Sequence, residues 1–170
     1  VYFAPEPEPE QLGEIHIHNG GMVLAAPYMQ RLFSILELTQ GPRFRDPVAA
    51  GRAVHLLQFM VTGETETPEF QLVLNKMLCG ISGGVPLPRG IQITEFEQST
   101  IEQMLQGIIQ NWGALGSTSV RGLRETFLQR PAHLHWVEDA WQLKVVPGSF
   151  DMLLDRLRDI PSREEARRRM

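Results

Sequence analysis

The sequence has a single cysteine, Cys79, and no uninterrupted apolar run as long as the roughly 18 to 20 residues of a membrane helix. One cysteine cannot form an internal disulfide, and it cannot build a cysteine cage around a metal. Its rarity favours a reducing compartment such as a bacterial cytoplasm. The chain opens on prolines and glutamates, where an export signal has a basic start and an apolar stretch. We therefore expect no membrane partner and no export signal of the chain's own.

A strong positive charge is also missing. The formal net charge is -4 and the pI is near 5.7. Lysines and arginines are spread along the chain until its last few residues. A protein that binds the phosphate backbone concentrates such residues on one surface, so nucleic acid is not an expected partner.

Signatures of catalysis are missing too. The chain has no Gly-x-Ser-x-Gly elbow and no Gly-x-x-x-x-Gly-Lys-Ser/Thr loop. Cys79 follows Met77 and Leu78, which predicts a buried and inert thiol. Carboxylates are present, but a sequence cannot show two of them facing each other across a cleft, and we expect Glu14, Glu64, Glu66 and Glu69 to be mostly solvated. The protein is therefore not expected to be an enzyme.

The length of 170 residues suits one ordinary hydrophobic core. Residues 1–12 are rich in proline and glutamate, which predicts an extended linker. We expect a single helical domain over 13–158 and a charged, disordered or frayed tail over 159–170. The linker, together with a first residue other than methionine, suggests a fragment of a longer protein whose missing portion lies on the N-terminal side.

Hydrophobic spacing and capping residues predict about six helices. Asp46 before Pro47 and Thr67 before Pro68 each resemble an N-cap followed by a first-turn proline. Thr94-Glu-Phe-Glu97 has the form of a capping box, and it precedes apolar residues at three- and four-residue spacing. The predicted helices cover 27–38, 46–63, 67–80, 94–112, 119–130 and 150–157.

Two regions are typical of β-structure. Ile15 and Ile17 alternate with polar residues, which predicts a short strand over 13–18, and Asn19-Gly-Gly21 then predicts a turn. The runs 132–137 and 141–146 favour a hairpin. The expected fold is mainly α, a compact bundle of about six helices with a short N-terminal strand and a small β-hairpin near the C-terminus.

Histidines occur as two pairs spaced two residues apart. His16 and His18 lie in the predicted strand, and His133 and His135 lie in the predicted hairpin. Each pair would project to one face of its strand. Neither pair is followed by an Asp, Glu or Cys at a recognisable ligand spacing. We interpret these side chains as structural and expect no metal and no cofactor.

Polar residues interrupt two otherwise apolar helices. Asn75 and Lys76 lie in the most apolar helix, where a polar group must find a partner or reach water. The later helix carries several charged residues, two of which are one turn apart and suited to pair. Two interpretations stay open: a polar edge beside a core stripe, or a docking surface. The candidate interaction surface consists of Asn75, Lys76, Arg121, Arg124, Glu125 and Arg130.

Four long segments carry a resemblance to a known family. They are Leu56-Leu-Gln-Phe-Met-Val-Thr-Gly63, Pro68-Glu-Phe-Gln-Leu-Val-Leu-Asn-Lys-Met-Leu-Cys-Gly80, Leu105-Gln-Gly-Ile-Ile-Gln-Asn-Trp-Gly-Ala-Leu115 and Ser119-Val-Arg-Gly-Leu-Arg-Glu-Thr-Phe-Leu-Gln-Arg130. With the opening strand, they resemble the C-terminal region of the contractile injection system tape measure family, in the same order and from about Ile15 to Leu157. The chain departs from that family after Leu157, where the family has Leu-Pro-Trp motifs and this sequence has an arginine-rich end.

The resemblance implies a phage-tail-like particle with an inner tube, a contractile sheath and a baseplate. In such a particle an extended protein fills the tube during assembly and sets the tube length. The present chain would be the folded C-terminal part of that protein. The implied partners are inner tube, baseplate hub or cap proteins, with a homo-oligomer as a further arrangement. The implied location is the bacterial cytoplasm during assembly and the lumen of the particle afterwards.

Two other functions stay open at this stage. The region could be an adaptor that binds cargo or a maturation factor in the same particle. It could also be a lytic or proteolytic enzyme carried inside the particle, an option that rests only on the presence of Glu and His residues.

Overall fold

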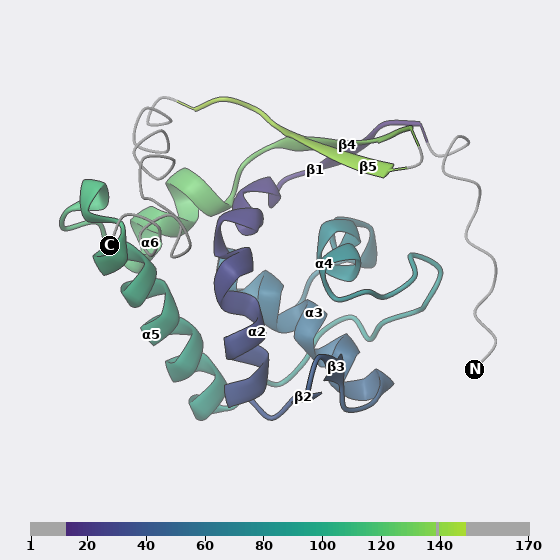
Figure 1. Ribbon diagram of the computed structural model, residues 1–170, viewed down its shortest axis with the longest axis horizontal. Helices are drawn as coiled ribbons and strands as arrows, with labels where there is room; N and C mark the ends of the chain where they lie inside the picture. Colours follow the sequence, from purple (N-terminus) through teal and green to yellow (C-terminus); the bar gives the residue numbers. More distant parts are fainter. Residues whose placement is uncertain (1–12, 139, 149–170) are drawn as a thin grey trace, which may run out of the picture.

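The computed structural model describes residues 13–138 and 140–148. In this part of the chain a three-stranded antiparallel sheet lies across one side of a group of helices (Figure 1). The α-helices are α2 (Ala26–Ile35), α3 (Pro47–Thr62), α4 (Val73–Leu78), α5 (Glu95–Asn111) and α6 (Val120–Leu123). The strands are β1 (Ile15–Ile17), β2 (Thr39–Gln40), β3 (Arg43–Phe44), β4 (Ala132–Val137) and β5 (Ala140–Val145). Short 3₁₀ turns are η1 (Gly20–Ala25), η2 (Glu69–Gln71) and η3 (Gly113–Leu115), and a π-helical stretch, η4 (Arg124–Leu128), follows α6.

The helix count is lower than predicted. The described residues contain five α-helices rather than about six, and they are only about half helical, so "mainly α" overstates the helical content. The predicted helix over 150–157 lies outside the described residues, as do the linker over 1–12 and the tail over 159–170. The predicted helix over 67–80 is broken into η2 and α4 at Leu72, whose φ of -102° and ψ of 15° depart from the α-helical conformation.

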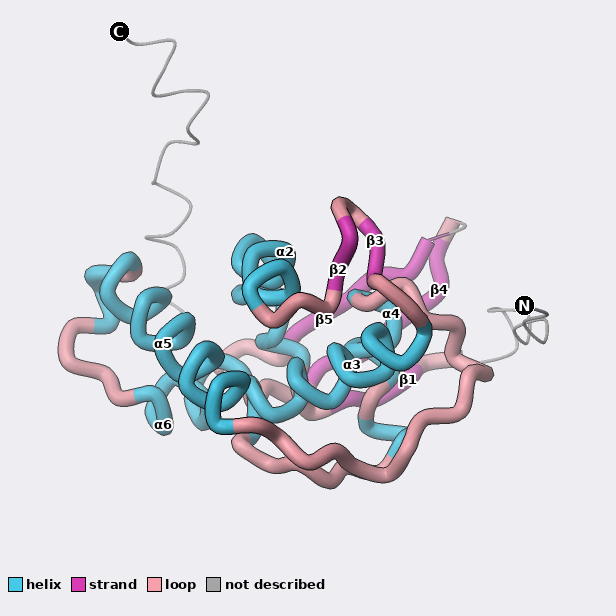
Figure 2. Tube along the Cα trace, turned by 90° about the horizontal axis from the view of Figure 1, so that it is seen from below, coloured by secondary structure: helices cyan, strands magenta, loops and turns pink. Residues whose placement is uncertain are grey.

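Helix α3 is the centre of the fold. Its N-cap Asp46 accepts a hydrogen bond from the amide of Ala49 at 2.7 Å, and Gly63, with φ of 79°, ends the helix in the left-handed conformation. Most of its side chains are buried, on every side of the helix. The helices α4, α5 and η4 all pack against it, and Figure 2 shows α3 and α5 from the side opposite the sheet. The proline and glycine signals in the sequence correctly predicted both of its ends.

Helix α5 begins with the predicted capping box. The hydroxyl of Thr94 accepts from the amide of Glu97 at 3.1 Å, and the carboxylate of Glu97 accepts from the amide of Thr94 at 3.0 Å. Ile101 and Leu105 are fully buried on the side that faces the core. The predicted helix over 94–112 is therefore confirmed.

The three-stranded sheet has the order β1-β4-β5, with both neighbours antiparallel. Ile15 lies opposite Leu134, and Leu134 lies opposite Leu143. These residues and Ile17 pack against the core, so the alternate residues form the outer face of the sheet, where His16, Gln142 and Lys144 are exposed and His133 and His135 are half-buried. The predicted hairpin is confirmed. The pairing of β1 with β4, which are far apart in sequence, was not predicted, and neither was the small β2–β3 hairpin, whose strands are too short for a periodicity.

Gly20 and Gly21 form the start of η1 instead of a simple turn. Neither has a positive φ. A Cβ on Gly21 would lie 1.7 Å from the carbonyl oxygen of Phe127, and one on Gly20 would lie 2.4 Å from the Cβ of Ala132. The glycines are needed because η1 packs backbone to backbone against the segment around η4.

Candidate functional site

Asn75 is the centre of a buried amide cluster. Nδ2 of Asn19 donates to Oδ1 of Asn75 at 2.7 Å and to Oε1 of Gln58 at 2.9 Å. Nδ2 of Asn75 donates to the carbonyl of Val54 at 3.1 Å and to Gln58 at 3.2 Å. The cluster ties η1, α3 and α4 together inside the core. The sequence predicted that Asn75 needs a partner, and the partners are internal.

Lys76 is buried to the tip of its side chain. Its Nζ donates to the carbonyl of Val85 at 2.7 Å, to the carbonyl of Gly83 at 3.0 Å and to Oε1 of Glu69 at 2.6 Å. A buried ammonium group is tolerated only when its donors are satisfied. Lys76 therefore holds the glycine- and proline-rich loop after α4 against the helix.

Arg124 closes the C-terminal end of α3. It donates from Nε to the carbonyl of Met60 at 3.0 Å and from Nη2 to the carbonyl of Phe59 at 3.2 Å, and its guanidinium lies 5.4 Å from the ring centroid of Phe59. Gln129 adds a bond to the carbonyl of Val61 at 3.0 Å. The last carbonyls of a helix have no partner within the helix, and a cation there also suits the helix dipole. Burial lowers the pKa of Arg124.

Arg130 is buried and bonded within the fold. It donates to the carbonyl of Thr126 at 3.0 Å and to the carbonyl of Val146 at 3.1 Å, and it therefore fastens the end of the sheet to η4. Arg121 and Glu125, by contrast, are exposed and pair with each other at 2.8 Å.

The predicted interaction surface is thus divided by the fold. Arg121 and Glu125 lie in solvent, whereas Asn75, Lys76 and Arg130 are buried and Arg124 is half-buried. Contact of this surface with another protein stays a prediction. Of its six residues, burial leaves Arg121 and Glu125 accessible to a partner.

An apolar groove runs between α2 and α5. Phe96 is 61% exposed and Ile35 is 44% exposed on its two sides. Its remaining lining includes Tyr28, Met104 and Gly107. A second hollow shares Tyr28 and Asn111 with it and continues past α5 to Leu123 on α6 and Leu128. The sequence placed Phe96 in the capping box, and its position away from the stripe of Ile101, Leu105 and Ile108 indicates a second apolar face of the helix.

Histidines from two strands meet on the outer face of the sheet. His16 lies opposite His133, and one ligand atom from each of them and one from Glu14 all lie within 4.8 Å of one another. Spacing along the sequence relates only histidines of the same strand, so it did not predict this group. His18 is not part of it. Pairing of β1 with β4 was the missing information.

Cys79 is buried, as predicted, and burial raises the pKa of its thiol to about 12. The reactive form of cysteine is the thiolate, so this side chain is inert in the folded protein. Within the described residues, no helix is both long enough and apolar enough to cross a membrane.

In the described residues, helices packed under a small antiparallel sheet form an α+β arrangement with an apolar groove on its surface. The sequence model of the contractile injection system tape measure proteins matches residues 4–158. The chain belongs to this family. No curated protein and no solved structure matches it.

Membership confirms the resemblance carried by the four segments. It gives the chain a role related to tape measure proteins in a contractile injection system, and it implies contact with other particle proteins and a place in the tube of the particle. It also suggests a non-enzymatic role.

Proposed function

We infer that this domain is the folded C-terminal part of a tape measure protein and that it docks on an inner tube, baseplate hub or cap protein. In this proposal an extended segment sets the length of the inner tube, at about 1.5 Å per residue where it is helical. The folded domain anchors that segment. Assembly takes place in the bacterial cytoplasm, and the domain lies in the lumen of the finished particle.

The observation that carries the proposal is the family match over 4–158, combined with the exposed groove between α2 and α5. Phe96 and Ile35 expose apolar surface on both sides of this groove. Polar side chains of Arg31, Gln103 and Asn111 also line this groove. Apolar anchors among polar residues are an arrangement typical of protein interfaces.

The docking role is tested by pull-down with purified tube, hub and cap proteins. The double variant Phe96→Ser with Ile35→Ser is expected to reduce capture at least about tenfold, because it removes two apolar anchors. The matched controls are Phe70→Ser and Val48→Ser, since these side chains are 74% and 81% exposed and lie outside the groove. Equal capture by the double variant and the controls would contradict the use of the groove.

The length-setting role needs intact particles. Removal of residues 13–158 in the producing organism is expected to abolish assembly or to give tubes of irregular length, measured by electron microscopy. Particles of normal number and length would argue against the anchor. Capture of cargo or a maturation factor in place of structural components would favour the adaptor function instead.

A further inference from the structure

Four side chains with metal-binding groups share the outer face of the three-stranded sheet. Glu14 and His16 are contributed by the β1 segment, and His133 and His135 are contributed by β4. His16 and His133 are direct cross-strand partners, and their rings meet edge to face with centroids 4.5 Å apart. The antiparallel register therefore places them on the same face of the sheet.

The carboxylate of Glu14 lies between the two histidines of β4. Its Oε1 is 3.0 Å from Nδ1 of His133 and 3.7 Å from Nδ1 of His135. The approach to His133 is close but does not have the direction of a hydrogen bond. Nδ1 of His133 and Nε2 of His135 are buried without a hydrogen-bond partner among the residues that the structure describes. Buried polar atoms without partners are rare, so this group has unused capacity to bind a ligand.

The donor set indicates which ligand. Two imidazoles and a carboxylate form a common three-residue set for Zn²⁺, whereas Ca²⁺ and Mg²⁺ take mainly oxygen ligands. Ligands at 2.0 to 2.1 Å from a tetrahedral ion are about 3.4 Å apart. The ligand atoms of Glu14, His16 and His133 are already within 4.8 Å of one another. Glu14 and His16 are exposed, so rotation of their side chains can close the remaining gap.

We propose that Glu14, His16 and His133 bind one Zn²⁺ ion or a similar first-row divalent cation on the outer face of the sheet. The exposed side of the ion holds water, as in other sites with three protein ligands. The ring of His135 lies nearly parallel to that of His133, with centroids 6.3 Å apart, on the same face of β4. The bound ion links β1, a strand of three residues at the sheet edge, to β4. This goes beyond the proposed docking function, which uses the groove between α2 and α5.

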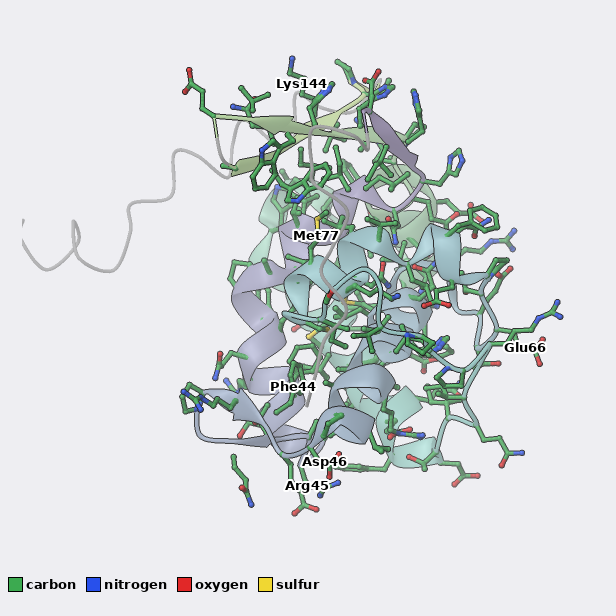
Figure 3. The ribbon with its side chains drawn as sticks, turned by 90° about the vertical axis from the view of Figure 1, so that its right-hand side faces the viewer. Phe44, Arg45, Asp46, Glu66, Met77 and Lys144 are labelled. Carbon is green, nitrogen blue, oxygen red and sulfur yellow. The ribbon has the colours of Figure 1, made fainter. Side chains whose placement is uncertain are left out.

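The neighbouring strand β5 carries a positive charge close to the proposed ion. Lys144 lies directly opposite His133 on β5 and is exposed. Figure 3 shows it at the sheet, at the other end of the molecule from Arg45 and Asp46. Its ammonium group repels a cation bound at His133. Removal of this charge therefore tightens binding, a response that a site elsewhere on the surface would not show.

The test is titration of the full chain with Zn²⁺ by calorimetry, together with the visible spectrum of the Co²⁺ form. One ion per chain and an intense four-coordinate Co²⁺ spectrum are expected. His16→Ala and Glu14→Gln are each expected to weaken binding at least about tenfold. Lys144→Gln is expected to strengthen it. The matched control is His18→Ala, an exposed histidine of the same segment that is outside the group.

Thermal unfolding gives a second measurement. Zn²⁺ is expected to raise the Tm of the original chain and of the His18→Ala variant, because it binds only the folded state with β1 and β4 paired. It is expected to raise the Tm of His16→Ala by less at the same Zn²⁺ concentration. Absence of one-to-one binding, or equal binding by the His16→Ala and His18→Ala variants, would overturn the proposal.

Discussion

Asn75 has no exposed surface, and its amide contacts two other amides and the carbonyl of Val54. A polar residue at such a position stabilises the fold only while its partners remain, because each unpaired buried polar group costs about 1 to 3 kcal/mol. Arg124 follows the same principle at the C-terminal end of α3. At the scale of single residues, most of the candidate interaction surface is therefore committed to hydrogen bonds within the fold.

Asn75→Ala is expected to lower the free energy of unfolding by about 2 kcal/mol, since Asn19 loses a hydrogen-bond acceptor inside the core. Urea denaturation measures this change. The matched control is Asn111→Ala at the exposed end of α5, with an expected change within about 0.5 kcal/mol. Equal effects of the two substitutions would show that the amide cluster does not stabilise the core.

At the scale of elements, the close packing of η1 depends on glycine. A Cβ on Gly21 would overlap the backbone of Phe127, whereas one on Gly107 in α5 would meet nothing within 4 Å. Gly21→Ala is expected to destabilise the fold by at least about 3 kcal/mol. Gly107→Ala is expected to stabilise it by about 0.5 to 1 kcal/mol, because alanine favours the helix. Thermal unfolding of the two variants measures both effects, and effects of the same sign would contradict this packing.

The ion pair between α3 and α5 makes stability depend on pH. Arg52 donates to both carboxylate oxygens of Glu97 at 2.6 Å. Burial raises the pKa of Glu97, but the bonds from Arg52 and from the amide of Thr94 outweigh it, so the pKa lies below the ordinary value of 4.5. A carboxyl with a lowered pKa contributes stability above pH 4.5 and loses it as the pH falls through the folded-state pKa.

Glu97→Gln is therefore expected to reduce stability near neutral pH by about 1 kcal/mol, a modest effect because Arg52 remains in contact with water. The difference between the variant and the original chain should shrink as the pH is lowered below 4.5. Tm measured against pH checks this prediction. A difference that stays constant down to low pH would show that Glu97 acts through packing alone.

At the scale of the whole molecule, one core connects the sheet to the helices. Ile17 and Leu134 from the sheet belong to the same buried cluster as Leu57 from α3 and Ile101 from α5. A shared core of this kind favours a single cooperative transition. The two layers should therefore unfold together.

Tryptophans in both layers make this measurable. Trp112 is buried at the end of α5, while Trp136 and Trp141 contact each other across the sheet hairpin. In the Trp112→Phe variant the remaining tryptophans report on the sheet, and in the Trp136→Phe, Trp141→Phe double variant Trp112 reports on the helices. Within each variant, urea unfolding followed by fluorescence is expected to give the same midpoint as unfolding followed by circular dichroism. Separate midpoints for the two probes within one variant would contradict a single transition.

The sequence by itself determined the elements whose signals are local. The start of α3 is marked by Asp46 and Pro47 and its end by Gly63, and the start of α5 is marked by Thr94 with Glu97. Capping and termination involve residues within one turn of each other, so the sequence shows them directly. The sheet hairpin followed from its apolar runs, and the family followed from four long segments. The same local signals overestimated the helix over 67–80, because Leu72 departs from the α-helical conformation between η2 and α4.

Only the tertiary structure decided which distant residues meet. Pairing of β1 with β4 brings His16 beside His133, and the fold brings Asn19, just before η1, within hydrogen-bond distance of Asn75 on α4. It also left Phe96 on a groove and buried Lys76 of α4 beneath the loop that follows this helix. These contacts join segments far apart in the chain, and they depend on how whole elements pack, a choice that residue spacing within one element does not specify.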